Sequence, residues 1–118
     1  MAAIDATVIA LAPDAKYGEN AIRQWTLADN DTGVAINMAE YSDRSVQVTG
    51  LTADSLAIHG SNDGTNYVLL TNPQGDALTF AADGLRQIAE ATAYIKPVRT
   101  GTADVTIVVT LYMLRGRR

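Results

Sequence analysis

The fold class follows from one C-terminal stretch, Val105-Thr106-Ile107-Val108-Val109-Thr110-Leu111-Tyr112-Met113. Its odd-numbered positions are all apolar, whereas its even-numbered positions include two threonines and a tyrosine. Because side chains alternate between the two faces of a β-strand, this pattern predicts a strand with one face in the core. The other face, which carries Thr110 and Tyr112, is expected to be half exposed or to lie against another subunit.

The same alternation recurs upstream in shorter segments. It is clear in 44–49, where Val46 and Val48 are expected to face inward, and in 55–59. Further strands are predicted at 7–11, 22–28, 67–70, 76–81, 85–90 and 94–99, and residues 34–40 fit either a strand or a single helical turn. Pro97 has no N–H to donate, which indicates an edge position or a bulge.

Turn-forming residues separate these segments. Residues 60–66, Gly-Ser-Asn-Asp-Gly-Thr-Asn, predict a hairpin loop, and Asn72-Pro73-Gln74-Gly75 is typical of a type I turn. About eight short strands with turns between them predict an all-β fold, either an antiparallel β-sandwich or a jelly-roll-like barrel. The 118 residues suit one domain, with a less regular N-terminal region at 1–40 and a basic tail at 115–118.

The composition restricts the possible chemistry. Cysteine is absent and His59 is the only histidine, so disulfides, thiol catalysis and cysteine-based metal sites are excluded. His59, Ser61 and Asp63 are close in sequence, but a catalytic triad is defined by geometry, and we expect His59 to be a hydrogen-bonding residue at a strand end. The loop around Asp63 and the pair Asp29 and Asp31 supply too few carboxylates for calcium. We therefore expect no enzymatic activity, no metal and no cofactor.

The formal net charge of −4 is unevenly distributed. Residues 1–84 hold eleven acids and three bases, whereas residues 85–118 hold two acids and six bases. The three arginines of the tail fit a solvated end or a contact with an acidic protein surface. Nucleic acid is not an expected partner, because no stacking aromatic residues accompany them.

Neither a membrane nor secretion is expected. The apolar run at 105–114 is about half the length needed to span a bilayer. The N-terminus has no basic opening followed by a long apolar stretch, so the chain is expected to be made in a cytoplasm. The single tryptophan, Trp25, fits the core, a subunit interface or a ligand-stacking position, and the pattern does not choose among them.

Four segments resemble a family of small virion proteins of tailed bacteriophages, the head decoration or capsid cement proteins. They are residues 41–50 (YSDRSVQVTG), 56–67 (LAIHGSNDGTNY), 94–99 (YIKPVR) and the last strand with its end, Arg115-Gly116-Arg117-Arg118. The resemblance implies a non-enzymatic protein, made in the host bacterial cytoplasm, that lies on the outer capsid surface. It also implies the major capsid protein as partner, with neighbouring subunits bridged to stabilise the mature head.

The residues expected to contact the capsid or another subunit are Trp25, Thr110, Tyr112, Arg115, Arg117 and Arg118. A homo-oligomer is expected, and both a trimer and a dimer remain open. The alternative is a carbohydrate- or host-surface-binding sandwich module of a phage tail or fibre. That alternative predicts clustered exposed aromatic residues, whereas the tyrosines here are scattered along the sequence.

Overall fold

The computed structural model describes residues 3–9, 20–28, 31–39, 41–101 and 103–115, and within these ranges it contains twelve β-strands and no helix. The strands are β1 (Ala3–Ile4), β2 (Thr7–Val8), β3 (Asn20–Leu27), β4 (Thr32–Gly33), β5 (Ile36–Asn37), β6 (Tyr41–Thr49), β7 (Ser55–Ser61), β8 (Val68–Leu69), β9 (Thr79–Phe80), β10 (Gly84–Ile88), β11 (Tyr94–Thr100) and β12 (Ile107–Arg115). The all-β prediction is confirmed. The described part of the chain has no helix long and apolar enough to cross a membrane.

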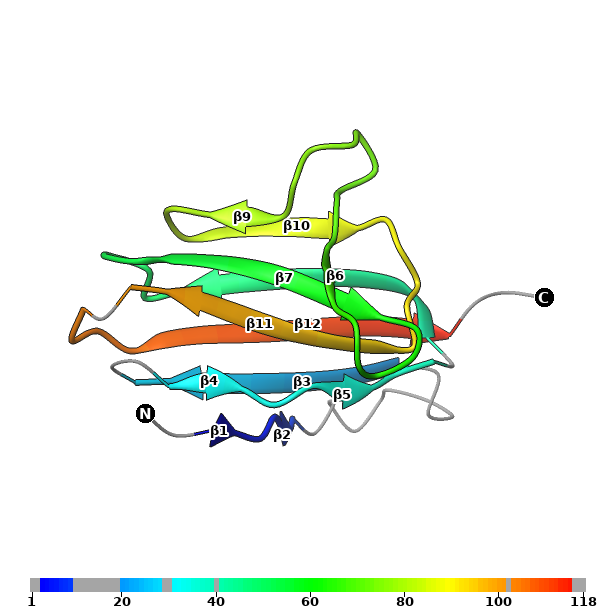
Figure 1. The fold of residues 1–118 in the computed structure, drawn as a ribbon, viewed down its shortest axis with the longest axis horizontal. Helices are drawn as coiled ribbons and strands as arrows, with labels where there is room; N and C mark the ends of the chain where they lie inside the picture. The colour runs from blue at the N-terminus through cyan, green and yellow to red at the C-terminus, as the bar shows by residue number, and fades with distance from the viewer. Residues whose placement is uncertain (1–2, 10–19, 29–30, 40, 102, 116–118) are drawn as a thin grey trace.

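Most strands belong to two antiparallel sheets that lie face to face (Figure 1). The first, which we call the β12 sheet, has the order β10-β6-β12-β3-β2. The second, the β11 sheet, has the order β5-β11-β7-β8, and β9 also pairs with β7. Outside the two sheets, β1 pairs in parallel with β4.

The connectivity identifies the sandwich as a jelly roll. Eight strands form its frame: β3, β5, β6, β7, β8, β10, β11 and β12. We number these eight strands 1 to 8 along the chain. One sheet then has the order 1-8-3-6 (β3, β12, β6, β10), and the other has the order 2-7-4-5 (β5, β11, β7, β8). Every connection except the β7–β8 hairpin therefore crosses between the sheets, as in a double-sheet jelly roll. The hairpin itself is the one predicted around residues 60–66.

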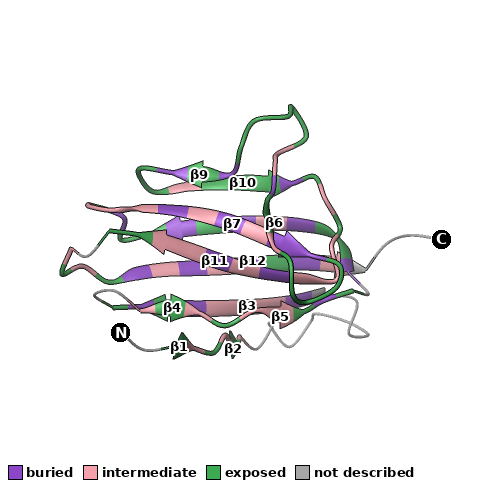
Figure 2. Cartoon of the chain, in the orientation of Figure 1, coloured by how far each residue is buried: buried purple, intermediate pink, exposed green. Residues whose placement is uncertain are grey.

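Buried residues alternate with more exposed ones along the long strands (Figure 2), and the buried side chains form the core between the sheets. Ile107, Val109, Leu111 and Met113 of β12 are buried, as the period of two predicts. The other inward-facing predictions are confirmed as well, since Val46, Val48, Leu56 and Ile58 are all buried. The core is thus mainly aliphatic, with Trp25, Phe80 and Tyr41 as its buried aromatic residues among those described.

Several sequence predictions are refined by the structure. Residues 34–40 contain a short strand, β5, rather than a helical turn. Of residues 76–81, only Thr79–Phe80 form a strand, preceded by an isolated bridge between Thr71 and Ala77. β11 lies between β5 and β7, but its pairing with β5 covers only Tyr94 and Ile95. Pro97 lies beyond that pairing, so the predicted edge position is correct locally.

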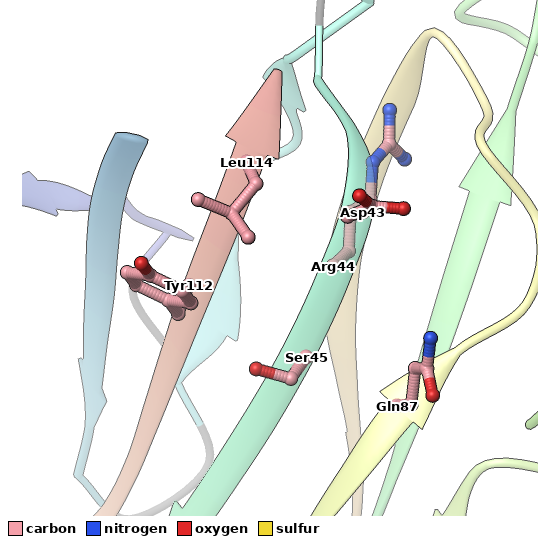
Figure 3. A pocket seen from close by; sticks show the side chains of 6 residues that line it. All are labelled: Asp43, Arg44, Ser45, Gln87, Tyr112 and Leu114. Atoms are coloured by element: carbon pink, nitrogen blue, oxygen red, sulfur yellow. The ribbon is translucent and has the colours of Figure 1, made fainter. Parts of the chain in front are cut away.

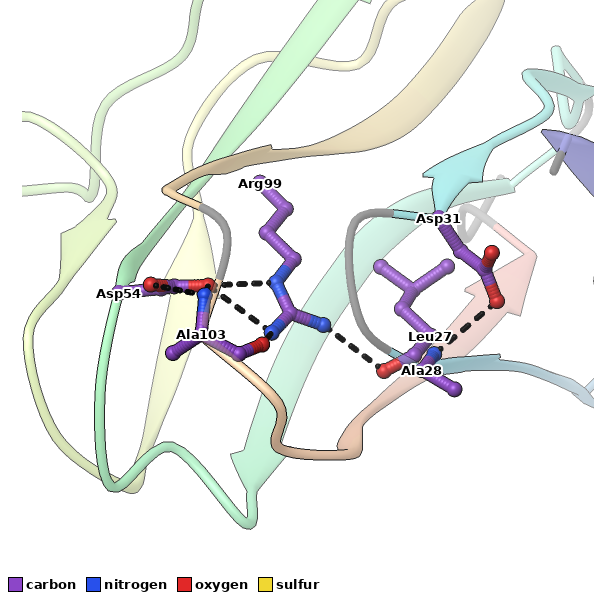
Figure 4. Close-up of polar contacts among 6 residues, drawn as sticks. All are labelled: Leu27, Ala28, Asp31, Asp54, Arg99 and Ala103. Atoms are coloured by element: carbon purple, nitrogen blue, oxygen red, sulfur yellow. Dashed lines mark hydrogen bonds and ion pairs between the residues drawn. The ribbon is translucent and has the colours of Figure 1, made fainter. Parts of the chain in front are cut away.

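Two buried arginines hold opposite ends of the sandwich together. At one end, Arg99 binds Asp54 and the backbone carbonyls of Leu27 and Ala103 (Figure 4). At the other end, Arg44 is 2% exposed and donates to the carbonyls of Tyr41, Met38 and Thr92. Arg44 belongs to the same alternating set as Val46 and Val48, which is why its side chain faces inward.

Candidate binding face

The outward face of the β12 sheet is built from transverse rows of residues. The strand registers align Leu85, Gln47, Thr110, Gln24 and Thr7 across all five strands. Neighbouring rows add Gln87, Ser45, Tyr112 and Ile22 on one side, Thr49, Val108 and Thr26 on the other, and Leu114 and Asp43 at the end of the face. We call these fourteen residues the β12 face.

The β12 face is almost free of charge. Of its fourteen residues only Asp43 is ionisable at neutral pH, whereas charged residues make up 19% of the chain. The exposed surface of this face therefore consists of amides, hydroxyls and apolar groups. Leu85 is 66% exposed and Tyr112 is 37% exposed, which places two large apolar side chains on it.

Hydrogen bonds fix the centre of the β12 face. The Gln24 side chain donates from Nε2 to Thr110 Oγ1 at 2.9 Å. Thr7 Oγ1 in turn donates to the backbone carbonyl of Gln24 at 3.2 Å, which ties the edge strand β2 to β3. The central row is thus ordered by contacts within the sheet itself.

A shallow hollow of about 240 Å³ lies at one end of this face. It is lined by Asp43, Arg44, Ser45, Gln87, Tyr112 and Leu114. In Figure 3 the side chains of Tyr112, Leu114 and Ser45 come from the adjacent strands β12 and β6, and Gln87 comes from β10. The hollow is thus a depression in an otherwise flat face.

The predicted contact residues lie in different parts of the structure. Thr110 and Tyr112 lie on the β12 face, on the opposite side of the strand from the core. Trp25 is 1% exposed, and its Nε1 donates to the carbonyl of Val34 at 2.9 Å. The expected interface role of Trp25 is therefore corrected: the ring belongs to the core, one of the three positions left open by the sequence.

The predicted basic tail is described only at its start. The backbone of Arg115 ends β12, where it pairs with Tyr41 of β6. Arg117 and Arg118 lie outside the described residues, as does Asp29.

The residues around the β7–β8 loop form a turn. Ser61 Oγ donates to Asp63 Oδ1 at 2.8 Å, and accepts the backbone N–H of Gly64 at 2.9 Å. Hydrogen bonds from the backbone N–H groups of Asn66 and Thr65, and then from the side chains of Asn66 and Ser61, hold the pKa of Asp63 well below its usual range. Ser61 and Asp63 therefore stabilise the turn through hydrogen bonds within it.

His59 lies on β7 opposite Lys96 of β11 and Leu69 of β8. Partial burial lowers the pKa of His59, and the nearby charge of Lys96 lowers it further. Lys96 Nζ lies 4.2 Å from the centre of the Tyr67 ring, in cation–π geometry. Among the described residues, no group of three or more His, Cys, Asp or Glu side chains is placed to hold a metal ion.

Sequence reasoning missed the breadth of the β12 face. It placed Thr110 and Tyr112 there, but it did not connect them to Gln24, Gln47 or Leu85. These residues come from three other strands and meet only through the sheet register. The available signal was the absence of charge at outward-facing strand positions.

The fold and this face together define an all-β jelly-roll sandwich with a broad uncharged surface. No protein-family profile matches the chain, and no curated protein matches it in sequence. Solved structures share the fold. The SPBc2 prophage-derived protein YomS aligns with a TM-score of 0.62 and 9% identity over 85% of this chain and 99% of that one.

Two further structures extend the comparison. A cupin superfamily protein from Desulfitobacterium hafniense aligns with a TM-score of 0.51 and 9% identity, over 94% of this chain and 78% of its own. A Klebsiella pneumoniae protein with a double-stranded β-helix domain aligns with a TM-score of 0.50 and 9% identity, over 98% and 75%. At such identities the similarity shows a common jelly-roll fold.

Proposed function

We propose that this protein is a non-enzymatic structural component of a tailed-bacteriophage virion. It binds the outer surface of the mature head and bridges neighbouring major capsid protein subunits. The four sequence segments that resemble head decoration proteins support this proposal, and so does the shared fold with a prophage-derived protein over nearly its whole length. The observation that carries it is this sequence resemblance, and the β12 face adds a broad uncharged surface that suits contact with another protein subunit.

The β12 face suits protein contact better than chemistry. Depletion of charged residues is the compositional mark of the centre of a protein–protein interface. The face spans five strands, and in its central row the Gln24–Thr110 hydrogen bond orders both side chains before any partner binds. Such preordering lowers the entropic cost of association.

Bridging explains how a small protein stabilises a large shell. A molecule held by one capsid subunit meets the next at a high effective concentration, so the second contact adds affinity without new chemistry. A protein that binds only the expanded lattice also stabilises that lattice by mass action. Many modest contacts then oppose the pressure of the packaged DNA.

The basic tail supplies a second, electrostatic contact. β12 ends at Arg115, and Gly116, Arg117 and Arg118 follow it in the sequence. The remaining chain is acidic, so these arginines are the most concentrated positive charge in the sequence. Contact with an acidic patch on a capsid subunit would be weakened by salt.

Sedimentation with phage heads tests the proposal. The purified protein is mixed with mature heads and with unexpanded heads, and each mixture is pelleted. We expect pelleting with mature heads only. Deletion of residues 115–118 should weaken binding and its salt dependence, whereas Arg86→Gln, which removes one exposed cation elsewhere, should change neither. Equal pelleting with both heads, or none, would overturn the proposal; binding to a glycan surface instead would support the tail or fibre module.

A further inference from the structure

We infer that the β12 face is the interface of a twofold homodimer, in which the outer faces of two β12 sheets pack against each other. This goes beyond the proposed function, because dimer formation in solution needs no capsid. It assigns Thr110 and Tyr112 to the subunit contact and leaves the rest of the surface and the basic tail for the capsid.

Charge favours a second copy as the occupant. A strongly acidic or basic partner would require opposite charges on this face, and Asp43 is its only charged residue. The chain as a whole carries a net charge of −4, so two copies approach with least repulsion through an uncharged face. Two β12 faces can therefore approach each other with little electrostatic repulsion.

Hydrogen-bonding capacity is also self-complementary. The amides of Gln47 and Gln87 and the hydroxyls of Ser45 and Thr49 can each both donate and accept. In a twofold interface the same patch meets itself, so it needs groups of this dual character rather than donors on one side and acceptors on the other. Leu85, which is 66% exposed, adds apolar area that association would remove from water.

The size of the face predicts a weak, transient dimer. Five strands about 4.8 Å apart are roughly 20 Å wide, and the outward residues from Val108 to Leu114 span about 20 Å along the strand. Each copy thus contributes about 400 Å² of flat area, and more once side-chain relief is counted. Two flat faces bury about 800 Å², below the ~1,000 Å² typical of stable specific interfaces, so we expect a transient dimer that forms at micromolar or higher protein concentrations.

Sedimentation velocity of the full chain tests this inference. We expect the wild-type protein to pass from monomer to dimer as its concentration rises through the micromolar range. Gln47→Lys places two like charges in the interface and should weaken dimerisation at least about tenfold, a change of 1.4 kcal/mol. The matched control Thr79→Lys puts the same charge at an exposed position on the β11 sheet and should dimerise like wild type.

A second variant guards against misfolding. Leu85→Ser removes exposed apolar area without adding charge, and it should also weaken the dimer, with circular dichroism unchanged. A wild-type protein that stays monomeric at all concentrations, that forms trimers, or that dimerises equally well as Gln47→Lys would overturn the inference. If the wild type is monomeric but still pellets with mature heads, the dimer is wrong and the capsid proposal stands.

Discussion

Arg99 Nε lies 2.9 Å from Asp54 Oδ2, and the two side chains are only 1% and 7% exposed. Arg99 also donates to the carbonyls of Leu27 and Ala103 at 3.1 and 2.7 Å, while the N–H of Ala103 donates to Asp54. The pair thereby joins the end of β3, the β6–β7 connection and the β11–β12 connection. Asp54 itself has a φ of 69°, a left-handed conformation that aspartate tolerates better than most residues.

Removing Asp54 should therefore be costly. Asp54→Ala leaves the guanidinium buried without its counter-ion, and we expect a loss of about 3–5 kcal/mol in the free energy of unfolding. Urea denaturation followed by tryptophan fluorescence measures this loss. Asp43→Ala, at an exposed position on β6, should cost less than about 0.5 kcal/mol. Equal effects of the two substitutions would show that the buried pair does not stabilise the fold.

Arg44 should resist even conservative replacement. Its guanidinium donates to carbonyls of the β5–β6 connection, the first residue of β6 and the β10–β11 connection, an arrangement that the single ammonium of lysine cannot reproduce. Burial also lowers the pKa of Arg44, because a buried charge is costly. A lysine at this position would be charged with fewer hydrogen bonds to offset that cost. We expect Arg44→Lys to destabilise by about 2–4 kcal/mol in urea denaturation, and the exposed Arg86→Lys to have almost no effect. An Arg44→Lys protein as stable as wild type would contradict this role.

Gly60 should not accept a methyl group. A Cβ at this position would lie 2.5 Å from Thr92 Oγ1 and 3.0 Å from both terminal carbons of Leu70. Because Leu70 is in the core and Thr92 binds Arg44, neither neighbour can move freely. Gly60→Ala is expected to cost about 1–3 kcal/mol, measured by thermal unfolding. Gly75→Ala cannot serve as the control for this substitution, because Gly75 has a φ of +89°, a left-handed conformation in which alanine itself is strained.

Asp63 should make stability depend on pH in the acid range. Its pKa is lowered in the folded state by hydrogen bonds from Asn66, Thr65 and Ser61, so the unfolded chain takes up the proton first as pH falls. The stabilisation is complete above the unfolded pKa of about 4 and is lost as pH falls toward the lowered value. Urea midpoints at neutral and acid pH should therefore differ less in Asp63→Asn than in wild type. An identical acid sensitivity would contradict the assignment.

Much of the fold was predictable because it depends on local pattern. The period of two in 105–113 placed Ile107, Val109, Leu111 and Met113 in the core, and the turn formers marked the β7–β8 hairpin. Strand order was not predictable, since a jelly roll pairs strands that are distant in sequence, such as β3 with β12.

In the candidate site, too, local pattern was predictable and the pairing of distant strands was not. Alternation alone put Thr110 and Tyr112 on the outer face of their strand. The partners Gln24, Gln47 and Leu85 follow from register, which depends on how whole strands align. Trp25 was ambiguous because a single tryptophan satisfies both core and interface patterns; its hydrogen bond to Val34 decides for the core.

Electron cryomicroscopy of mature heads incubated with the purified protein tests the central claim most directly. The account predicts added density on the outer capsid surface, with each copy contacting at least two major capsid protein subunits. Pairs of copies should meet through their β12 sheets. Heads that show no added density at saturating protein would contradict a role in capsid decoration.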